Sequence, residues 1–122
     1  MLTAEIHEAA AELGRSLNQA PAVSAYRTTR AALDADPGAL ALMEKLRRLQ
    51  QAFIAAQQSG ESAAPDAMED LRLVQAEVRH NEVIMAHLRA SNEVKAFLPL
   101  VAAEVSRELG ADYAKLIAPT SC

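Results

Sequence analysis

Asp36-Pro37-Gly38-Ala39 is the segment that decides the fold, because it carries the features that open an α-helix. The Asp36 side chain is short and can accept hydrogen bonds from the exposed amides of a first helical turn. Pro37 falls within that turn, where its fixed φ suits the helix and its missing N–H is no loss. Similar helix-opening segments recur at Ala20-Pro21-Ala22-Val23, Ala64-Pro65-Asp66-Ala67 and Asn81-Glu82-Val83-Ile84.

These four segments divide the 122 residues into five expected helices, each with apolar residues at helical spacing. The expected helices span residues 3–17, 21–35, 37–58, 65–80 and 81–109. Residues 59–64 are small, polar and glycine-containing, so they form the tip of a hairpin between the third and fourth helices. The sequence therefore predicts an all-α antiparallel helical bundle, in a single domain of residues 1–122.

The last third of the chain leaves two alternatives open. Pro99 lies inside the long fifth helix and removes one of its backbone hydrogen bonds. It either kinks this helix near residues 95–98 or opens a second, shorter helix. Gly110 is a natural residue for ending the helix. Residues 111–122 are expected to form a short, partly frayed tail in which Tyr113, Leu116 and Ile117 can dock.

The composition favours helix and predicts a thinly filled core. Alanine accounts for 27 residues, tryptophan is absent, and no run alternates β-branched or aromatic residues in the manner of a strand. Helices faced with alanine bury little apolar area, and at ~25 cal/mol per Å² this leaves an isolated monomer weakly stabilised. We therefore expect a homodimer, or a heteromer with a related chain.

The charge pattern disfavours a dedicated nucleic-acid surface, since the net charge is −4 and is spread along the chain. Lys45, Arg47 and Arg48 form the densest positive cluster, and together with Arg27 and Arg30 they carry the alternative of direct RNA binding. The sequence has no apolar stretch of 18 residues and no signal-peptide pattern at its start, so we expect a cytoplasmic protein.

No pattern of catalytic or metal-ligating residues stands out, so we expect neither an enzyme nor a metal site. Glu77 and His80 form one E-x-x-H pair, but a di-metal site in a bundle needs a second pair and further carboxylates. His80 is better explained by its place at the negative end of a helix. His7 and His87 lack the spacing of zinc ligands. Cys122 is the single cysteine, which excludes an internal disulfide and fits a reducing compartment.

Four segments carry a family resemblance through their order and spacing. They are Tyr26 followed by AALDADPGA at residues 31–39, LQQ at residues 49–51, NEVIMAHL at residues 81–88, and residues 104–114 ending in LGADYA. This arrangement resembles the YlbF/YmcA family of small helical bacterial regulators, to which the YheA-like proteins are related. The sequence departs from the family at Glu82, where proline is usual, at Ala20, where a capping serine is common, and at Pro99.

The resemblance implies a non-enzymatic regulatory adaptor that acts through protein–protein interaction. Members of this family modulate ribonuclease Y-dependent mRNA processing and are linked to biofilm formation, competence and sporulation. The implied partners are related helical regulators, a YaaT-like protein and the ribonuclease machinery. Some members are associated with an iron–sulfur cluster in such a complex. In this sequence only Cys122 corresponds to the C-terminal cysteines of those members. One thiolate is too few for a cluster that usually takes four cysteine ligands, so we expect no cofactor. The alternative is an iron–sulfur cluster whose other ligands come from partner subunits.

The resemblance also directs attention to apolar helix faces that could recruit a partner. The candidates on the third and fifth expected helices are Leu46, Leu49, Phe53, Leu98 and Val105. The same positions fit an ordinary intramolecular core equally well, because both roles place apolar residues at helical spacing.

Overall fold

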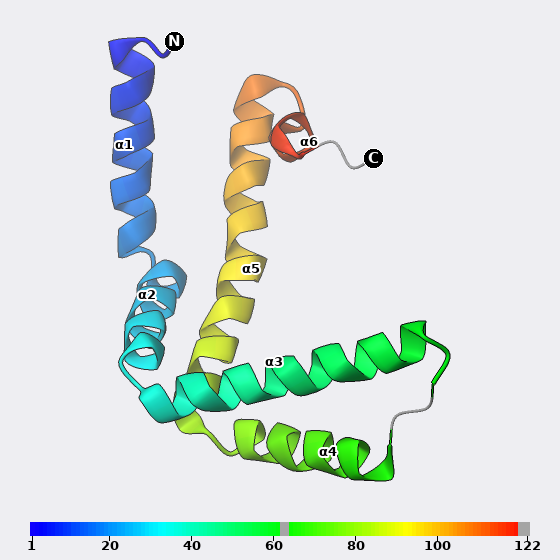
Figure 1. Cartoon of the computed structure of the whole chain (residues 1–122). Helices are drawn as coiled ribbons and strands as arrows, with labels where there is room; N and C mark the ends of the chain where they lie inside the picture. Colours follow the sequence, from blue (N-terminus) through cyan, green and yellow to red (C-terminus); the bar gives the residue numbers. More distant parts are fainter. Residues whose placement is uncertain (62–63, 120–122) are drawn as a thin grey trace. The chain divides into compact units, whose positions relative to one another are not determined.

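The computed structural model describes residues 1–61 and 64–119, and in these residues it contains six helices and no strand (Figure 1). The helices are α1 (Ala4–Gln19), α2 (Pro21–Asp34), α3 (Pro37–Gln58), α4 (Pro65–Arg79), α5 (Glu82–Leu109) and α6 (Tyr113–Ile117). The all-α prediction is confirmed, including the long third and fifth helices and the α3–α4 hairpin.

Local capping explains where the helices begin. Asp36 Oδ1 accepts a hydrogen bond from the Ala39 amide at 3.0 Å, so α3 starts at Pro37 as predicted. Asn81 Oδ1 accepts from the Ile84 amide at 3.0 Å and opens α5 in the same way. Thr3 provides the equivalent contact for α1.

The helices fall into two compact units, and one of them is Arg27–Arg89. It contains most of α2, the α3–α4 hairpin and the first part of α5. Its main buried cluster is small and consists of Leu33, Ala39 and Ile84, one residue from each of α2, α3 and α5, while Val74 on α4 is buried outside that cluster. Half-buried apolar side chains pack around these three: Leu42, Val78 and Val83. The core therefore forms where the Asp36-Pro37 turn brings α2 and α3 together.

The other unit comprises Met1–Tyr26 and the described residues from Ala90 onward. Its only residue that is nearly inaccessible to solvent, among those described, is Ala90. The apolar stripe expected along α1 is present in the sequence, but Leu2, Ile6 and Leu13 are exposed and only Leu17 is half-buried. No residue of α1 is buried, so whether a partner covers its apolar stripe stays a prediction.

The C-terminal region differs from expectation in two places. The helix α5 continues through Pro99, so the alternative of two shorter helices is wrong, while the kink stays a prediction. Residues 113–117 form α6, where the sequence suggested only a tail. The Asp112 side chain caps α6 by accepting from the Lys115 amide at 3.2 Å, and Ser106 Oγ accepts from the Tyr113 amide at 2.8 Å. The fraying predicted for the end of this tail falls mainly on residues 120–122, which lie outside the described residues.

The length and hydropathy of the helices decide whether one of them could span a membrane. None of the described helices is both long enough and apolar enough to cross a bilayer.

The single-domain assignment of residues 1–122 stays a prediction.

Candidate interaction surfaces

The α3–α4 hairpin carries the first candidate surface, a shallow apolar groove. We call it the hairpin groove, and its lining residues are Phe53, Pro65, Met68, Glu69, Leu71, Arg72 and Gln75. The helices α3 and α4 lie side by side, so residues of both reach the groove (Figure 1). Met68, which lies three residues before Leu71 on α4, is 53% exposed. The groove therefore presents apolar surface that the chain itself leaves open.

A fixed ion pair borders the hairpin groove. Arg72 Nη2 donates to Glu69 Oε1 at 2.6 Å, three residues away on the same exposed face of α4. This hydrogen bond lowers the pKa of Glu69 and raises the pKa of Arg72. Both side chains remain charged at neutral pH, so the groove has an apolar floor with a polar edge. That combination is typical of non-obligate protein interfaces.

The predicted interaction face is divided between the two units. Leu46, Leu49 and Phe53 lie half-buried on α3 in the Arg27–Arg89 unit, and Phe53 lines the hairpin groove. Leu98 and Val105 lie on α5 in the other unit, where Leu98 is 43% exposed and Val105 is half-buried. The assignment of these five residues to an interface stays a prediction.

A second groove lies between the C-terminal part of α5 and α6. We call it the α5–α6 groove, and its lining residues are Lys95, Leu98, Pro99, Ala102, Ala103, Ser106, Arg107, Gly110, Ala111, Asp112 and Ala114. Most of its lining residues are small, and the larger ones are Lys95, Leu98 and Arg107. Sequence reasoning missed its α6 wall because it treated residues 111–122 as a tail. The signal was nevertheless present, since Gly110 followed by Asp112 is a helix stop followed by a helix cap.

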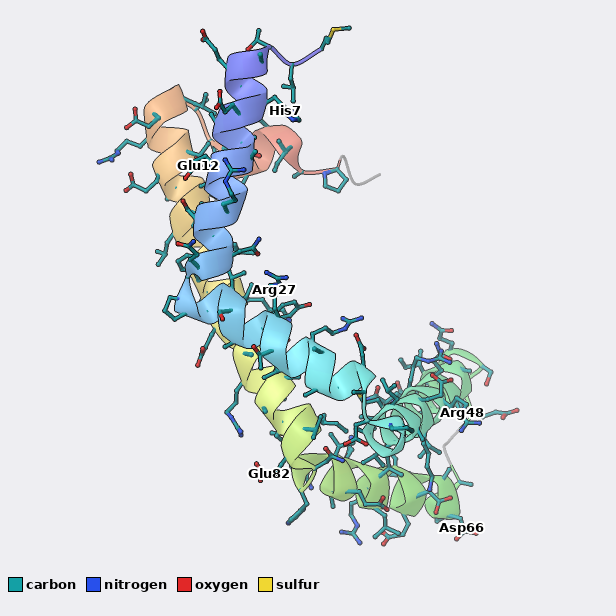
Figure 2. All side chains as sticks on the ribbon, turned by 90° about the vertical axis from the view of Figure 1, so that its left-hand side faces the viewer. His7, Glu12, Arg27, Arg48, Asp66 and Glu82 are labelled. Carbon is teal, nitrogen blue, oxygen red and sulfur yellow. The ribbon has the colours of Figure 1, made fainter. Side chains whose placement is uncertain are left out.

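The basic residues proposed for RNA binding do not form one free positive surface. Arg47 pairs with Glu44 and also donates to Gln51, and Arg30 pairs with Asp34 at 3.3 Å. The Arg47 hydrogen bond lowers the pKa of Glu44 and raises that of Arg47, which keeps both groups charged. Figure 2 shows another two of these residues, Arg27 on α2 and Arg48 on α3, well apart in the same unit. Pairing and separation both weaken the electrostatic attraction that RNA binding requires.

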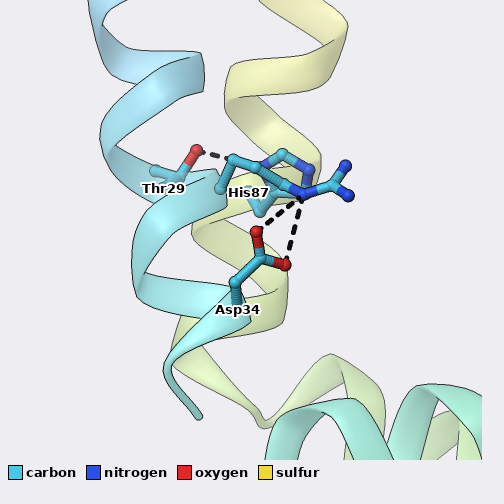
Figure 3. A network of polar contacts seen from close by, with 4 residues as sticks. Thr29, Asp34 and His87 are labelled. Carbon is cyan, nitrogen blue, oxygen red and sulfur yellow. Dashed lines mark hydrogen bonds and ion pairs between the residues drawn. The ribbon is translucent and has the colours of Figure 1, made fainter.

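A polar contact joins α2 to α5 within the Arg27–Arg89 unit. Thr29 Oγ1 and His87 Nδ1 are 3.0 Å apart and partly buried, and neighbouring Arg30 pairs with Asp34 (Figure 3). His87 thus has a structural partner that spacing along the sequence did not reveal. The contact links residues 58 positions apart, so it requires the tertiary fold.

The described residues offer no assembled metal site. No group of three or more His, Cys, Asp or Glu side chains comes together in residues 1–61 and 64–119. His80 caps α4, and its Nδ1 lies 2.8 Å from the Ala76 carbonyl oxygen, consistent with the capping interpretation of the E-x-x-H pair. Cys122, the candidate ligand for a shared cluster, lies outside the described residues.

This helical chain is similar to known proteins in both sequence and fold. The model of the family described as "Control of competence regulator ComK, YlbF/YmcA" matches residues 6–110. The chain belongs to the YlbF/YmcA family. A solved chain from the crystal structure of Bacillus subtilis RicA in complex with RicF is similar over 96% of this chain and 100% of that one, with 22% identity and a TM-score of 0.64. This similarity supports the fold. No curated protein sequence matches the chain.

Proposed function

We propose that this YlbF/YmcA-family chain is a non-catalytic regulatory adaptor of the cytoplasm, which binds a related helical chain through the hairpin groove. The observation that carries the proposal is the open apolar floor of this groove, formed by Phe53, Met68 and Leu71. Apolar surface that the chain leaves accessible is a common mark of a protein-binding site. Met68 still has about half of its surface available to a partner.

The chemistry of the groove fits a helical partner. A partner helix presents apolar side chains at spacings of three and four residues, and such side chains can enter a groove between two helices. The Glu69–Arg72 pair at its edge offers one acceptor and one donor group to a polar rim. The similar solved chain comes from a crystal structure of RicA in complex with RicF, which is a precedent for a heteromer that contains this fold.

The finer part of the proposal concerns the process that the adaptor regulates. The family description names control of a competence regulator. We propose that the assembly includes a YaaT-like protein and the ribonuclease machinery, and that it tunes ribonuclease Y-dependent mRNA processing with consequences for biofilm formation, competence and sporulation. This role is tested by mapping transcript ends in the host after the gene is deleted. The mapping is then repeated with either the wild-type chain or the Met68→Asp chain restored. Unchanged ends after deletion would refute the RNA-processing role.

The binding test uses one groove variant and one matched control. Met68→Asp places a charge on the apolar floor of the groove and should weaken binding of a second YlbF/YmcA-family chain from the same organism by at least about tenfold, measured by titration calorimetry. Leu73→Asp makes the same kind of change at an exposed leucine of α4. Leu73 is 46% exposed and lies five residues from Met68, which places it about 140° around the helix.

The control separates loss of the site from loss of folding. Both variants alter exposed residues, so both should keep the helical circular dichroism of the unchanged chain. Leu73→Asp should bind the family partner with nearly unchanged affinity. Equal weakening by both substitutions, or no weakening by Met68→Asp, would refute the hairpin groove as the binding site.

A further inference from the structure

The helix α1 keeps its apolar side open to solvent. Four residues of that side recur at spacings of three and four, and we call them the α1 stripe: Ile6, Ala9, Leu13 and Leu17. Ile6 is 53% exposed and Leu13 is 44% exposed, and no residue of α1 is buried. The helix spans 16 residues, about 24 Å at the helical rise, so a second helix of about four turns can lie along it. The α1 stripe therefore has the length and the spacing of a contact between two helices.

One flank of the α1 stripe is acidic. Glu5 and Glu12 directly precede Ile6 and Leu13, and they are seven residues apart, so they lie on the same side of the helix. In a pair of helices, side chains at such flanking positions meet the charges of the partner and select it. The opposite flank has small Ala10 in the corresponding position and carries no carboxylate. The charge beside the stripe is therefore one-sided.

Most of this negative charge is not compensated within α1. Arg15 pairs with Glu12 at 2.8 Å, but both side chains are well exposed, and an exposed pair contributes little, so a partner's cation can compete for Glu12. Among the described residues, Glu5 and Glu8 form no ion pair. Three glutamates and one arginine give α1 a net charge of −2 with His7 neutral. The flank thus offers one unpaired carboxylate and one weakly engaged carboxylate beside the stripe.

The same charges disfavour a second α1 as the occupant of the stripe. Two copies packed antiparallel would bring Glu5 and Glu12 of both helices to one flank, where like charges repel each other. Two parallel copies would set these carboxylates against the flank of Ala10, which offers no charge. An anionic lipid surface and a nucleic acid are disfavoured by the same repulsion. A cationic partner complements the acidic flank.

We propose that the α1 stripe is the docking surface for a cationic amphipathic helix of a protein unlike this chain. Such a helix carries its own apolar stripe at spacings of three and four, with lysine or arginine residues seven apart along one flank. Its apolar side chains cover Ile6 and Leu13, and its cations pair with Glu5 and Glu12.

This docking surface goes beyond the proposed function, because it adds a second class of partner through residues that the hairpin groove does not use. The α1 stripe belongs to Met1–Tyr26, whereas the hairpin groove belongs to the Arg27–Arg89 unit. An adaptor with two separate docking surfaces can connect two partners of different chemistry.

The first experiment titrates the full chain with fluorescently labelled synthetic peptides and follows the fluorescence anisotropy. The test peptide has about 18 residues, with leucines at spacings of three and four and lysines along one flank. One control peptide has glutamate in place of every lysine, and a second has the same composition as the test peptide in an order without a stripe. The test peptide should bind at least about tenfold more tightly than either control. Equal binding of the two lysine peptides would show only general attraction to an acidic protein and would overturn the proposal.

The second experiment removes apolar surface from the α1 stripe. Ile6→Gln leaves the charge unchanged and keeps a good helix former, and it should weaken binding of the test peptide by at least about tenfold. Met68→Gln makes the same kind of change in the hairpin groove and should leave this affinity unchanged. Both variants should keep the helical circular dichroism, because both residues are largely exposed. Equal effects of the two substitutions contradict the assignment of the stripe.

The third experiment reverses the charge of the acidic flank. Glu5→Lys combined with Glu12→Lys should weaken binding of the lysine peptide and strengthen binding of the glutamate peptide, each by at least about tenfold. The matched control is Asp70→Lys combined with Glu77→Lys, which reverses two exposed carboxylates that are also seven residues apart, on α4. This control should bind both peptides as the unchanged chain does. An equal loss of lysine-peptide affinity in the two double variants would refute the role of the flank.

Binding of the family partner separates this inference from the proposed function. Ile6→Gln should leave the affinity for the family partner unchanged, and Met68→Asp should leave the affinity for the lysine peptide unchanged. Loss of family-partner binding in Ile6→Gln would assign the α1 stripe to that partner instead. Binding to phosphatidylglycerol vesicles that Ile6→Gln abolishes would assign the stripe to a lipid surface. Either of these two results would overturn the inference and leave the hairpin groove to be judged by its own variants.

Discussion

Leu33→Ala tests whether the junction of α2, α3 and α5 holds the Arg27–Arg89 unit together. Leu33 is 4% exposed and shares its core with Ala39 and Ile84. The substitution removes apolar carbons worth about 2 kcal/mol in transfer free energy and leaves a cavity that raises the loss to about 3 kcal/mol. The loss is large for a domain of this size, because whole-domain stabilities are about 5–15 kcal/mol.

Urea denaturation followed by circular dichroism at the helical band measures this loss. The midpoint should fall clearly for Leu33→Ala, and Leu73→Ala should cost less than about 1 kcal/mol because Leu73 is largely exposed. The dependence on protein concentration should be recorded for both, since association adds to apparent stability. Similar midpoints for the two variants would contradict the assignment of the core to this junction.

Four further outcomes follow from individual contacts. Asp36→Ala should lower stability by about 1 kcal/mol in thermal melts, whereas Asp36→Asn should lower it much less, because asparagine also caps helices well. Pro99→Ala restores a helical hydrogen bond and should raise the melting temperature; a fall would show that proline is favoured at this position. Arg47 lowers the pKa of Glu44 in the folded chain. The ionised Glu44 carboxylate therefore makes its full contribution to stability at pH values above its ordinary pKa of 4.5, and this contribution is lost as the pH falls through the lower pKa of the folded state. An NMR titration should therefore show the Glu44 pKa rising toward 4.5 in Arg47→Ala, and an unchanged value would contradict the pairing. Anaerobically purified chain should be as colourless as Cys122→Ser, and visible absorbance lost on that substitution would instead support a shared iron–sulfur cluster.

Sequence reasoning located the helices well where the signals are local. The α3 bounds were predicted to the residue because the Asp36 cap, the Pro37 turn and the glycine-containing hairpin tip all act within a few positions. The helix α6 was missed because its position depends partly on the Ser106–Tyr113 hydrogen bond, which joins residues seven apart. Such a contact forms only after the chain has turned at Gly110, so no periodic pattern of residues in the sequence indicates it.

The sequence did not reveal which residues cover each apolar helix face. Met68 lies at helical spacing from Leu71 on α4, yet it is 53% exposed beside the hairpin groove. The same holds for Ile6 and Leu13 on α1. An apolar stripe shows which side of a helix avoids water, but not whether the chain or a partner shields it. For the same reason, the sequence pointed to Leu98 without revealing the groove that it lines.

The interior of this chain has a consequence for how freely its sequence can vary. Among the described residues, no polar or charged side chain is buried, so the packed interior consists of aliphatic groups only. Aliphatic packing tolerates interchange of similar shapes, whereas an enclosed polar group would reject a mismatched neighbour. Exchanges among aliphatic residues of similar volume at Leu33, Val74 or Ile84 should therefore preserve the fold, whereas a polar residue there would have no partner.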